Sequence, residues 1–147
     1  MNWIYKGKPL KKVPKDAYGF VYSVTYLGGT TDEIKNFKFY IGKKVLEFSK
    51  KKRLTIKEKK LPENKRKRFK IEKKESDWQD YWGSSILLLN DVEKYGKKNF
   101  ERRIISFYYD KINLTYGETE TQFRFDVLRN DTWNISILGK FFRGKIK

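Results

Sequence analysis

Two strand-like runs that each carry a tyrosine decide the fold: residues 18–26, YGFVYSVTY, and residues 36–42, NFKFYIG. The first run alternates aromatic and β-branched residues with a period of two, which is typical of a half-buried strand. One face of that strand then carries Phe20, Tyr22, Val24 and Tyr26. Residues 28–32, GGTTD, lie between the runs and are typical of a loop. Together the two runs predict an antiparallel hairpin with a long connection.

Composition limits the chemistry that the chain can carry. A length of 147 residues suits one domain, which we expect to span residues 1–147. The chain has no histidine and no cysteine, which excludes disulfides, thiolate nucleophiles and thiolate zinc sites. Hydrolytic chemistry would therefore depend on tyrosine, carboxylate, lysine and arginine. No apolar run approaches the ~20 residues of a membrane span, and the N-terminus lacks a signal-peptide core. We expect a soluble cytoplasmic protein with no membrane partner.

Positive charge is concentrated in one segment of the chain. The formal net charge is +17, and residues 43–74 hold 16 Lys and Arg against four acidic residues, a net charge of +12. Such a segment suits a polyphosphate, because neutralising phosphates releases condensed counterions. The alternative is a solvated lysine-rich loop. We expect this basic insertion to contact DNA, and the candidate nucleic-acid-binding residues are Gly42, Lys43, Lys44, Lys57, Arg66, Arg68 and Lys70.

The basic insertion has a mirrored apolar pattern around a turn at residues 61–64, LPEN. Antiparallel partners have position numbers with a constant sum, and a turn of this composition can close them. The pairs that we expect are Leu54 with Ile71, Ile56 with Phe69, Thr55 with Lys70, and Lys57 with Arg68. The pattern predicts a two-stranded ribbon, apolar on one face and cationic on the other, of a shape that a DNA groove admits. The alternative is disorder without DNA, since like charges face one another.

Further elements follow on both sides of the insertion. Residues 1–17 read as an irregular arm, and residues 133–146 as a short strand or closing turn. A helix capped by Ser84 or Ser85 and stopped by Gly96 would present the apolar stripe Ile86, Leu87, Leu89 and Val92. A third strand is expected over residues 100–109. A second helix is expected over residues 116–128, with one face formed by Tyr116, Phe123 and Val127. This order predicts an α/β sandwich on an antiparallel sheet.

The paired tripeptides Phe20-Val21-Tyr22 and Tyr40-Ile41-Gly42 resemble the signature of the GIY-YIG nuclease superfamily, over about residues 18–137. The passage from Ser84-Ser85 through Lys94-Tyr95-Gly96 is similar to that family's helix-then-strand segment. With Tyr81-Trp82-Gly83 and Lys43-Lys44 added, the chain looks closest to small phage-encoded Seg-type relatives of homing endonucleases. It departs from the pattern in having Phe20 where the name-giving glycine stands.

The resemblance implies a GIY-YIG-like fold, a three-stranded antiparallel sheet flanked by helices. It also implies a DNA endonuclease that uses a single divalent metal, Mg²⁺ (or Mn²⁺). In that reading Tyr22, aided by Tyr40, activates a water molecule, and Glu118 holds the metal. The family's arginine has no certain counterpart; Arg53 is the first choice, and Lys43 or Lys44 could supply the charge instead.

Several of these assignments have structural alternatives. The dipeptide Trp133-Asn134 resembles the Tyr-Asn pair found late in several members. In that reading Asn134 would orient the phosphate or a metal-bound water; the alternative is a role in a turn or cap only. Glu118 would complete a capping box with Thr115, and Glu120 is the alternative metal ligand. Core packing is the alternative to base stacking for the aromatic residues Trp78, Tyr81 and Trp82.

Two functions from other classes stay open at the level of sequence. One is a catalytically inactive basic module that binds DNA or RNA and retains the fold. The other is an RNA-associated protein of the ribosomal kind. For an active nuclease, a single active site cuts one strand, so breaking both strands would require a homodimer or a protein partner.

Overall fold

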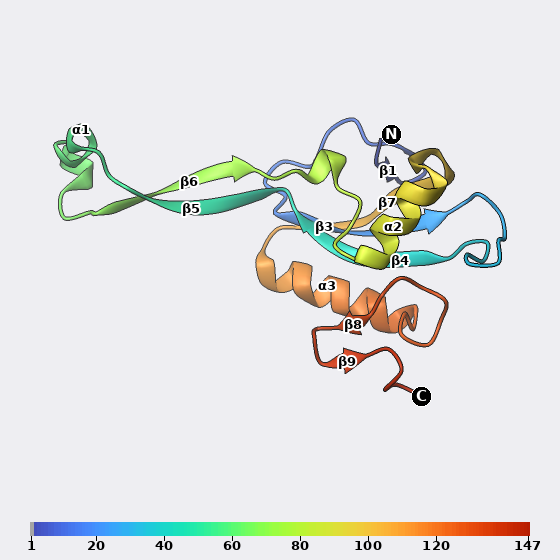
Figure 1. The fold of residues 1–147 in the computed structure, drawn as a ribbon. Helices are drawn as coiled ribbons and strands as arrows, with labels where there is room; N and C mark the ends of the chain where they lie inside the picture. Colours follow the sequence, from blue (N-terminus) through green and yellow to red (C-terminus); the bar gives the residue numbers. More distant parts are fainter. Residues whose placement is uncertain (1) are drawn as a thin grey trace.

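The computed structural model describes residues 2–147. Its central sheet has five strands in the order β2-β1-β7-β3-β4 (Figure 1). Its strands are β1 Ile4–Tyr5, β2 Lys8–Pro9, β3 Gly19–Tyr26, β4 Phe39–Val45 and β7 Phe100–Tyr108. Strand β3 is antiparallel to both β4 and β7, whereas the short β1 runs parallel to β7. The expected α/β class, with an antiparallel three-stranded centre flanked by helices, is confirmed.

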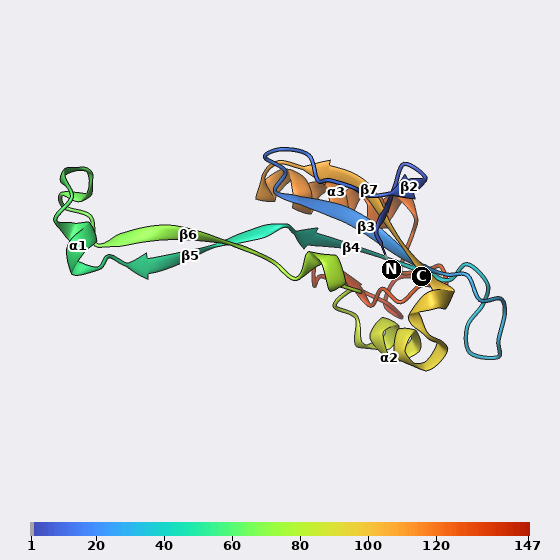
Figure 2. The ribbon, with the colours of Figure 1, turned by 90° about the horizontal axis from the view of Figure 1, so that it is seen from above.

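Strand β3 is buried on both faces, and its period of two separates two cores. The predicted face of Phe20, Tyr22, Val24 and Tyr26 packs into an aromatic core with α2, Ile86–Tyr95. The opposite face contributes Val21 to a smaller core with α3, Lys111–Arg124. Figure 2 shows the two helices on either side of the sheet. A side chain on β3 or β4 therefore faces one helix or the other, according to its position in the alternation.

Strand β4 is an edge strand that polar side chains protect. It covers residues 39–45, three residues later than predicted, so Tyr40-Ile41-Gly42 lies within the strand. The Ile41 N–H donates to Asn134 Oδ1 (3.1 Å), and the Ile41 carbonyl accepts from Asn134 Nδ2 (2.8 Å) and Gln122 Nε2 (3.0 Å). These bonds satisfy backbone groups that an edge strand would otherwise leave unpaired. They also fix the strand that carries Tyr40.

Helix α2 confirms the predicted caps and corrects the predicted apolar stripe. Ser85 is the N-cap and accepts from the Leu88 N–H, and Gly96 ends the helix with φ = 87°. The buried residues are Leu88 and Val92, whereas Ile86, Leu87 and Leu89 are exposed. Residues 86–89, ILLL, are apolar without a break, so periodicity could not decide which of them face the sheet.

Helix α3 begins five residues earlier than expected. Asp110 caps it by accepting from the Asn113 N–H (2.7 Å), so Glu118 lies mid-helix and the proposed capping box with Thr115 is wrong. The predicted face is also wrong, because Tyr116 is 70% exposed and Phe123 is exposed as well. The side that packs on the sheet carries Leu114, Gly117, Thr121 and Gln122. It includes a glycine and polar residues, which a search for apolar periodicity does not find.

The basic insertion forms a projecting ribbon, as predicted, with a different register. We call residues 47–75 the basic arm: β5, Glu47–Arg53, pairs antiparallel with β6, Phe69–Glu75, and α1, Ile56–Lys59, lies at the tip (Figure 1). The partner of Ile71 is Lys51 and that of Phe69 is Arg53, so the predicted pairs with Leu54 and Ile56 are wrong. A capping box between Thr55 and Glu58 starts α1 and ends the strand before those residues.

The termini add small elements to the sheet and the second core. The first 17 residues, expected to be irregular, include β1 and β2, and Trp3 is buried in the aromatic core. A 3₁₀ turn follows the arm at Trp78–Asp80. The expected closing turn is a two-stranded sheet of β8, Ser136–Ile137, and β9, Phe141–Phe142.

Within residues 2–147, no helix is both long enough and apolar enough to cross a membrane.

Replacing Asn134 by alanine should lower the free energy of unfolding by about 1–3 kcal/mol, because it leaves the Ile41 N–H buried without a partner. Urea unfolding measures the loss. Asn36→Ala removes an exposed amide and is the matched control. Equal stability of the two variants would contradict the role given to Asn134.

Candidate active site

The Tyr22 phenol lies across the edge strand because the residue opposite it has no side chain. Tyr22 pairs with Gly42 in the β3–β4 ladder. A Cβ atom at Gly42 would stand 2.7 Å from Tyr22 Oη and 2.9 Å from Tyr40 Cε1, closer than real Cβ atoms approach. The glycine of the second tripeptide therefore creates the space in which the two phenols meet, with ring centroids 6.1 Å apart.

A second glycine and a serine close this space from the loop before α2. Gly83 has φ = 118°, a conformation that favours glycine, and a Cβ there would lie 3.4 Å from Tyr22 Oη. The neighbouring Ser84 Oγ is 3.3 Å from Tyr40 Oη, at hydrogen-bonding distance. The Tyr22 hydroxyl is thus held between Gly42 and Gly83, and its side chain is only 1% exposed.

Arg102, which the sequence analysis did not select, organises the same loop. Its guanidinium lies between the rings of Trp3 and Trp82, 4.5 and 4.4 Å from their centroids. It donates to the carbonyls of Gln79 (3.0 Å) and Tyr81 (2.8 Å), and burial lowers the pKa of Arg102 to about 10. The alternation of β7 puts Arg102 on the buried face, so the pattern could have identified it.

Lys44 lies on the aromatic side of the sheet, over the Tyr81 ring. Its ammonium group lies 3.9 Å from the centroid of the Tyr81 ring and forms an ion pair of 2.5 Å with Asp77. The Tyr81 ring in turn packs edge-on against Tyr22, with centroids 6.0 Å apart. The pairing to Lys44 lowers the pKa of Asp77. Lys44 and the exposed Asp77 thus lie next to the Tyr81 ring, which packs against Tyr22.

Glu118 reaches the same part of β4 from the other face of the sheet. Lys43 points to that face, where its Nζ donates to Thr115 Oγ1 (2.9 Å) and lies 3.9 Å from Glu118 Oε1. Burial raises the pKa of Glu118, and the charge and backbone amide of Lys43 act against that rise. A half-buried carboxylate beside the amide edge of β4 is the result.

Burial and nearby negative charge both act on the two phenols. Burial raises the pKa of Tyr22 well above 10, and the neighbouring Tyr40, Tyr81 and Glu118 raise it further. Burial also raises the pKa of Tyr40, and Glu118 again contributes. The negative charge of Glu118 acts on both phenols from the other face of the sheet, where Glu118 lies beside Lys43 of β4.

Arg53 and Asn134 do not join this cluster. Arg53 ends β5, eleven residues beyond Gly42 along an extended chain, which is roughly 36 Å of strand. The Asn134 amide is buried and bonded to the Ile41 backbone, one residue from Gly42. Of the predicted DNA-binding residues outside β4, Lys57, Arg66, Arg68 and Lys70 all lie on the basic arm.

A family model matches residues 3–138, nearly the whole chain, and its description is "Putative endonuclease segE, GIY-YIG domain". The chain belongs to this GIY-YIG family. The match confirms the resemblance drawn from the paired tripeptides, and it supports a nuclease function with DNA as the substrate. Searches of curated proteins and of solved structures gave no match.

Replacing Gly42 by alanine should reduce nuclease activity at least tenfold, since the new Cβ would displace the Tyr22 and Tyr40 rings together. Plasmid cleavage measures the activity, and near-ultraviolet circular dichroism checks that the fold is kept. Wild-type cleavage by the folded variant would contradict the prediction.

Alkaline pH should destabilise the protein through Tyr22. Its pKa in the folded state is above the unfolded value of about 10, so the unfolded chain loses this proton first. The stability that Tyr22 contributes is complete below about pH 10 and is lost as the pH rises through the folded pKa. Urea unfolding at increasing pH should show a smaller alkaline loss for Tyr22→Phe than for wild type, with Tyr109→Phe, an exposed phenol, as the control. Identical losses in Tyr22→Phe and wild type would contradict this.

Proposed function

We propose that the chain hydrolyses DNA phosphodiester bonds at the Tyr22–Tyr40–Glu118 site with the help of one divalent metal ion. The observation that carries the proposal is the pair of phenols that meet over Gly42 on one face of the sheet, with Glu118 beside Lys43 of the same strand on the other face. The products would be a 5′ phosphate end and a free 3′ hydroxyl, since the attacking water bonds to phosphorus and the 3′ oxygen departs.

The residues around Gly42 fit a single Mg²⁺ or Mn²⁺ ion. Such ions take few protein carboxylates and keep bound waters and substrate phosphate oxygens. No group of three or more carboxylate, histidine or cysteine side chains lies together among residues 2–147, so Glu118 would be the main protein ligand. When bound, the ion would supply positive charge to the departing 3′ oxygen. Burial raises the pKa of Glu118, and a nearby cation would favour its ionised form.

Tyr22, once ionised to the phenolate, would accept the proton of the attacking water, with Tyr40 beside it. Burial opposes ionisation of the Tyr22 phenol, and so does the negative charge of Glu118. Positive charge next to Glu118 would cancel that second effect and make the phenolate more accessible. The Tyr40 hydroxyl, held by Ser84, is placed to share a hydrogen bond with the same water.

Lys44 is the best candidate for the charge that an arginine provides elsewhere in the family. It lies over the Tyr81 ring, which packs against Tyr22, whereas Arg53 is on the arm. Its partner Asp77 is exposed, so a DNA phosphate can replace that carboxylate on the ammonium group. Lys43 acts on the opposite face, where it balances Glu118. Asn134 would serve as a positioning residue, because it holds the strand that carries Tyr40.

A catalytically inactive DNA-binding module is the second candidate, and the burial of Tyr22 favours it. A general base must come within hydrogen-bonding reach of the water that it activates. In this structure the Tyr81 ring and Gly83 cover the Tyr22 hydroxyl. Cleavage would therefore require the loop of Tyr81 to move when DNA binds.

Tyr22→Phe and Glu118→Ala should each lower the rate of plasmid nicking with Mg²⁺ by at least 100-fold while DNA binding stays within about threefold of wild type. The first variant removes the proposed proton acceptor, and the second removes the metal ligand. The measurement is conversion of supercoiled plasmid to nicked circles, with binding followed by fluorescence anisotropy without metal.

Glu120→Ala is the matched control for this experiment. Glu120 lies two residues further along α3, is exposed, and pairs with Arg124. Its loss should leave nicking unchanged. Binding without any nicking by the wild type would support the inactive module, and full activity of Tyr22→Phe would rule out the proposed mechanism.

A further inference from the structure

The basic arm projects from the domain as a ribbon, and among its residues 47–75 only Leu54, near the tip, is buried. Every residue of β5 is exposed, and Phe69 and Ile71 of β6 are exposed as well. Figures 1 and 2 both show the ribbon extending away from the sheet, with α1 at its far end. Isolated two-stranded ribbons are marginally stable in water. Burial of apolar surface therefore does not account for this element.

Charge is the property that distinguishes the arm. Its 29 residues hold 14 Lys and Arg and five acidic residues, a net charge of +9 out of +17 for the chain. Lys52 and Lys70 are direct cross-strand partners, and Glu72 lies at ion-pair distance from both. The excess of positive charge over the rest of the arm is suited to a polyanionic partner.

Most of these cations have no carboxylate partner within the protein. Glu72 lies between Lys52 (3.6 Å) and Lys70 (3.5 Å), and Glu58 pairs with Lys70 at 2.7 Å. Across residues 2–147, no ion pair forms with the other twelve basic residues of the arm. They are Lys50, Lys51, Arg53, Lys57, Lys59, Lys60, Lys65, Arg66, Lys67, Arg68, Lys73 and Lys74. Lys70 is thus already neutralised, and the tip residues 65–68 are not.

The dimensions of the arm match those of duplex DNA. Seven paired residues at about 3.4 Å each give a ribbon of about 24 Å. Each strand of a duplex carries one phosphate per 3.4 Å, so the paired strands span about seven base pairs. The major groove of B-DNA is wide enough to admit a two-stranded ribbon.

The path from the active site to the arm is continuous. Strand β4 ends at Val45 and β5 begins at Glu47, so the strand that carries Tyr40 and Gly42 leads directly into the arm. At the root, Ser76 Oγ donates to the Val45 carbonyl (2.6 Å) and the Ser76 N–H donates to the Leu46 carbonyl (2.9 Å). The cations Lys43 and Lys44 lie at this root. A duplex bound at the site can therefore continue along the arm.

We propose that the basic arm binds duplex DNA on one side of the cut, over about seven base pairs, with the tip residues 65–68 contacting phosphates at the far end. This inference rests on the proposed function, because the scissile phosphate at Gly42 defines the other end of the bound duplex. Binding by the arm is electrostatic and independent of base sequence. It therefore increases affinity for duplex DNA and positions the protein along it, without selecting particular bases.

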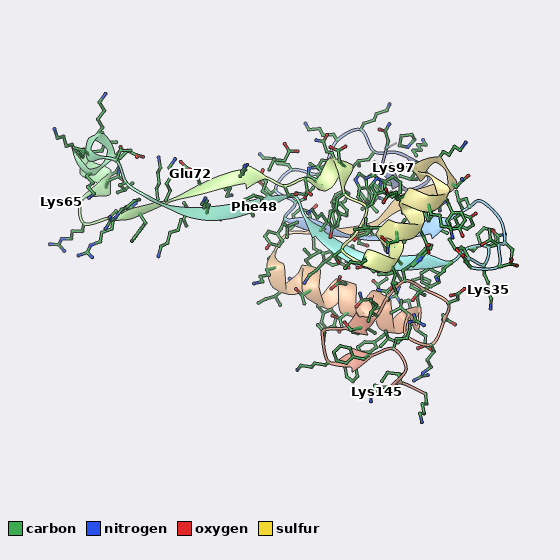
Figure 3. All side chains as sticks on the ribbon, in the orientation of Figure 1. Lys35, Phe48, Lys65, Glu72, Lys97 and Lys145 are labelled. Atoms are coloured by element: carbon green, nitrogen blue, oxygen red, sulfur yellow. The ribbon has the colours of Figure 1, made fainter. Side chains whose placement is uncertain are left out.

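The test compares two variants that each remove four positive charges. The first replaces Lys65, Arg66, Lys67 and Arg68 by glutamine. The second, a matched control, replaces Lys35, Lys140, Lys145 and Lys147, which are exposed and lie away from the arm. Figure 3 shows Lys65 at the tip of the arm, and Lys35 and Lys145 on the body of the domain. Both variants carry Tyr22→Phe, and binding is measured without divalent metal.

The expected result is a smaller salt dependence for the tip variant alone. The slope of log K against log[salt] should fall in magnitude by about 0.9 for each phosphate that the variant no longer neutralises, up to about 3.6 for four phosphates. On duplexes of increasing length, affinity should level off several base pairs earlier for the tip variant than for wild type. The control variant should keep the wild-type length dependence.

Equal slopes and equal length dependence for the tip and control variants would overturn the proposal. A loss of affinity in the tip variant that appears only with duplex RNA would also overturn it, since the partner would then be RNA. Neither outcome depends on cleavage. Failure of the proposed catalytic site would instead appear as nicking by Tyr22→Phe, which leaves these binding measurements unaffected.

Discussion

The space above Gly42 is the constraint on which the site depends. A side chain at this position would collide with the Tyr22 and Tyr40 rings at 2.7 and 2.9 Å. Because Gly42 has no side chain, Tyr22 of the central strand β3 extends its hydroxyl across the neighbouring edge strand β4. The second tripeptide therefore does two things at once, because Tyr40 supplies a phenol and Gly42 admits its partner.

The edge position of β4 leaves one side of the strand open to side chains from other elements. At the edge, the backbone groups of Ile41 face outward, where Asn134 and Gln122 bond to them. Glu118 reaches the amide of Lys43 two residues further along the same edge. The polar residues of α3 that face the sheet are thus part of the site's frame, which explains why that helix is not amphipathic in the ordinary way.

The sequence was sufficient for features that depend on local chemistry. Alternation identified the buried face of β3, Ser85 and Gly96 marked the ends of α2, and the paired tripeptides indicated the family. It was insufficient where tertiary contacts decide between similar local choices. The apolar run of residues 86–89 gives no preferred face, and Asp110 caps α3 although a later Thr115-x-x-Glu118 pattern is also present. In the arm, the capping box at Thr55 ends strand β5 before Leu54 and Ile56 can pair with β6. Pairing of apolar residues did not decide the register, because the two strands of the ribbon do not pack on a core.

The arm and the active site share one structural element, the ion pair between Lys44 and Asp77. These two residues flank the arm in sequence, so their pairing closes its root, next to the bonds that Ser76 makes to the strand. The same lysine lies over Tyr81, which covers Tyr22. A phosphate that binds Lys44 would compete with Asp77, and it would therefore loosen the root of the arm and the cover of the phenol together. Electrostatic contact with DNA and access to the buried hydroxyl would in this way be coupled through a single ammonium group, because Lys44 contacts both Asp77 at the root of the arm and Tyr81 beside the phenol.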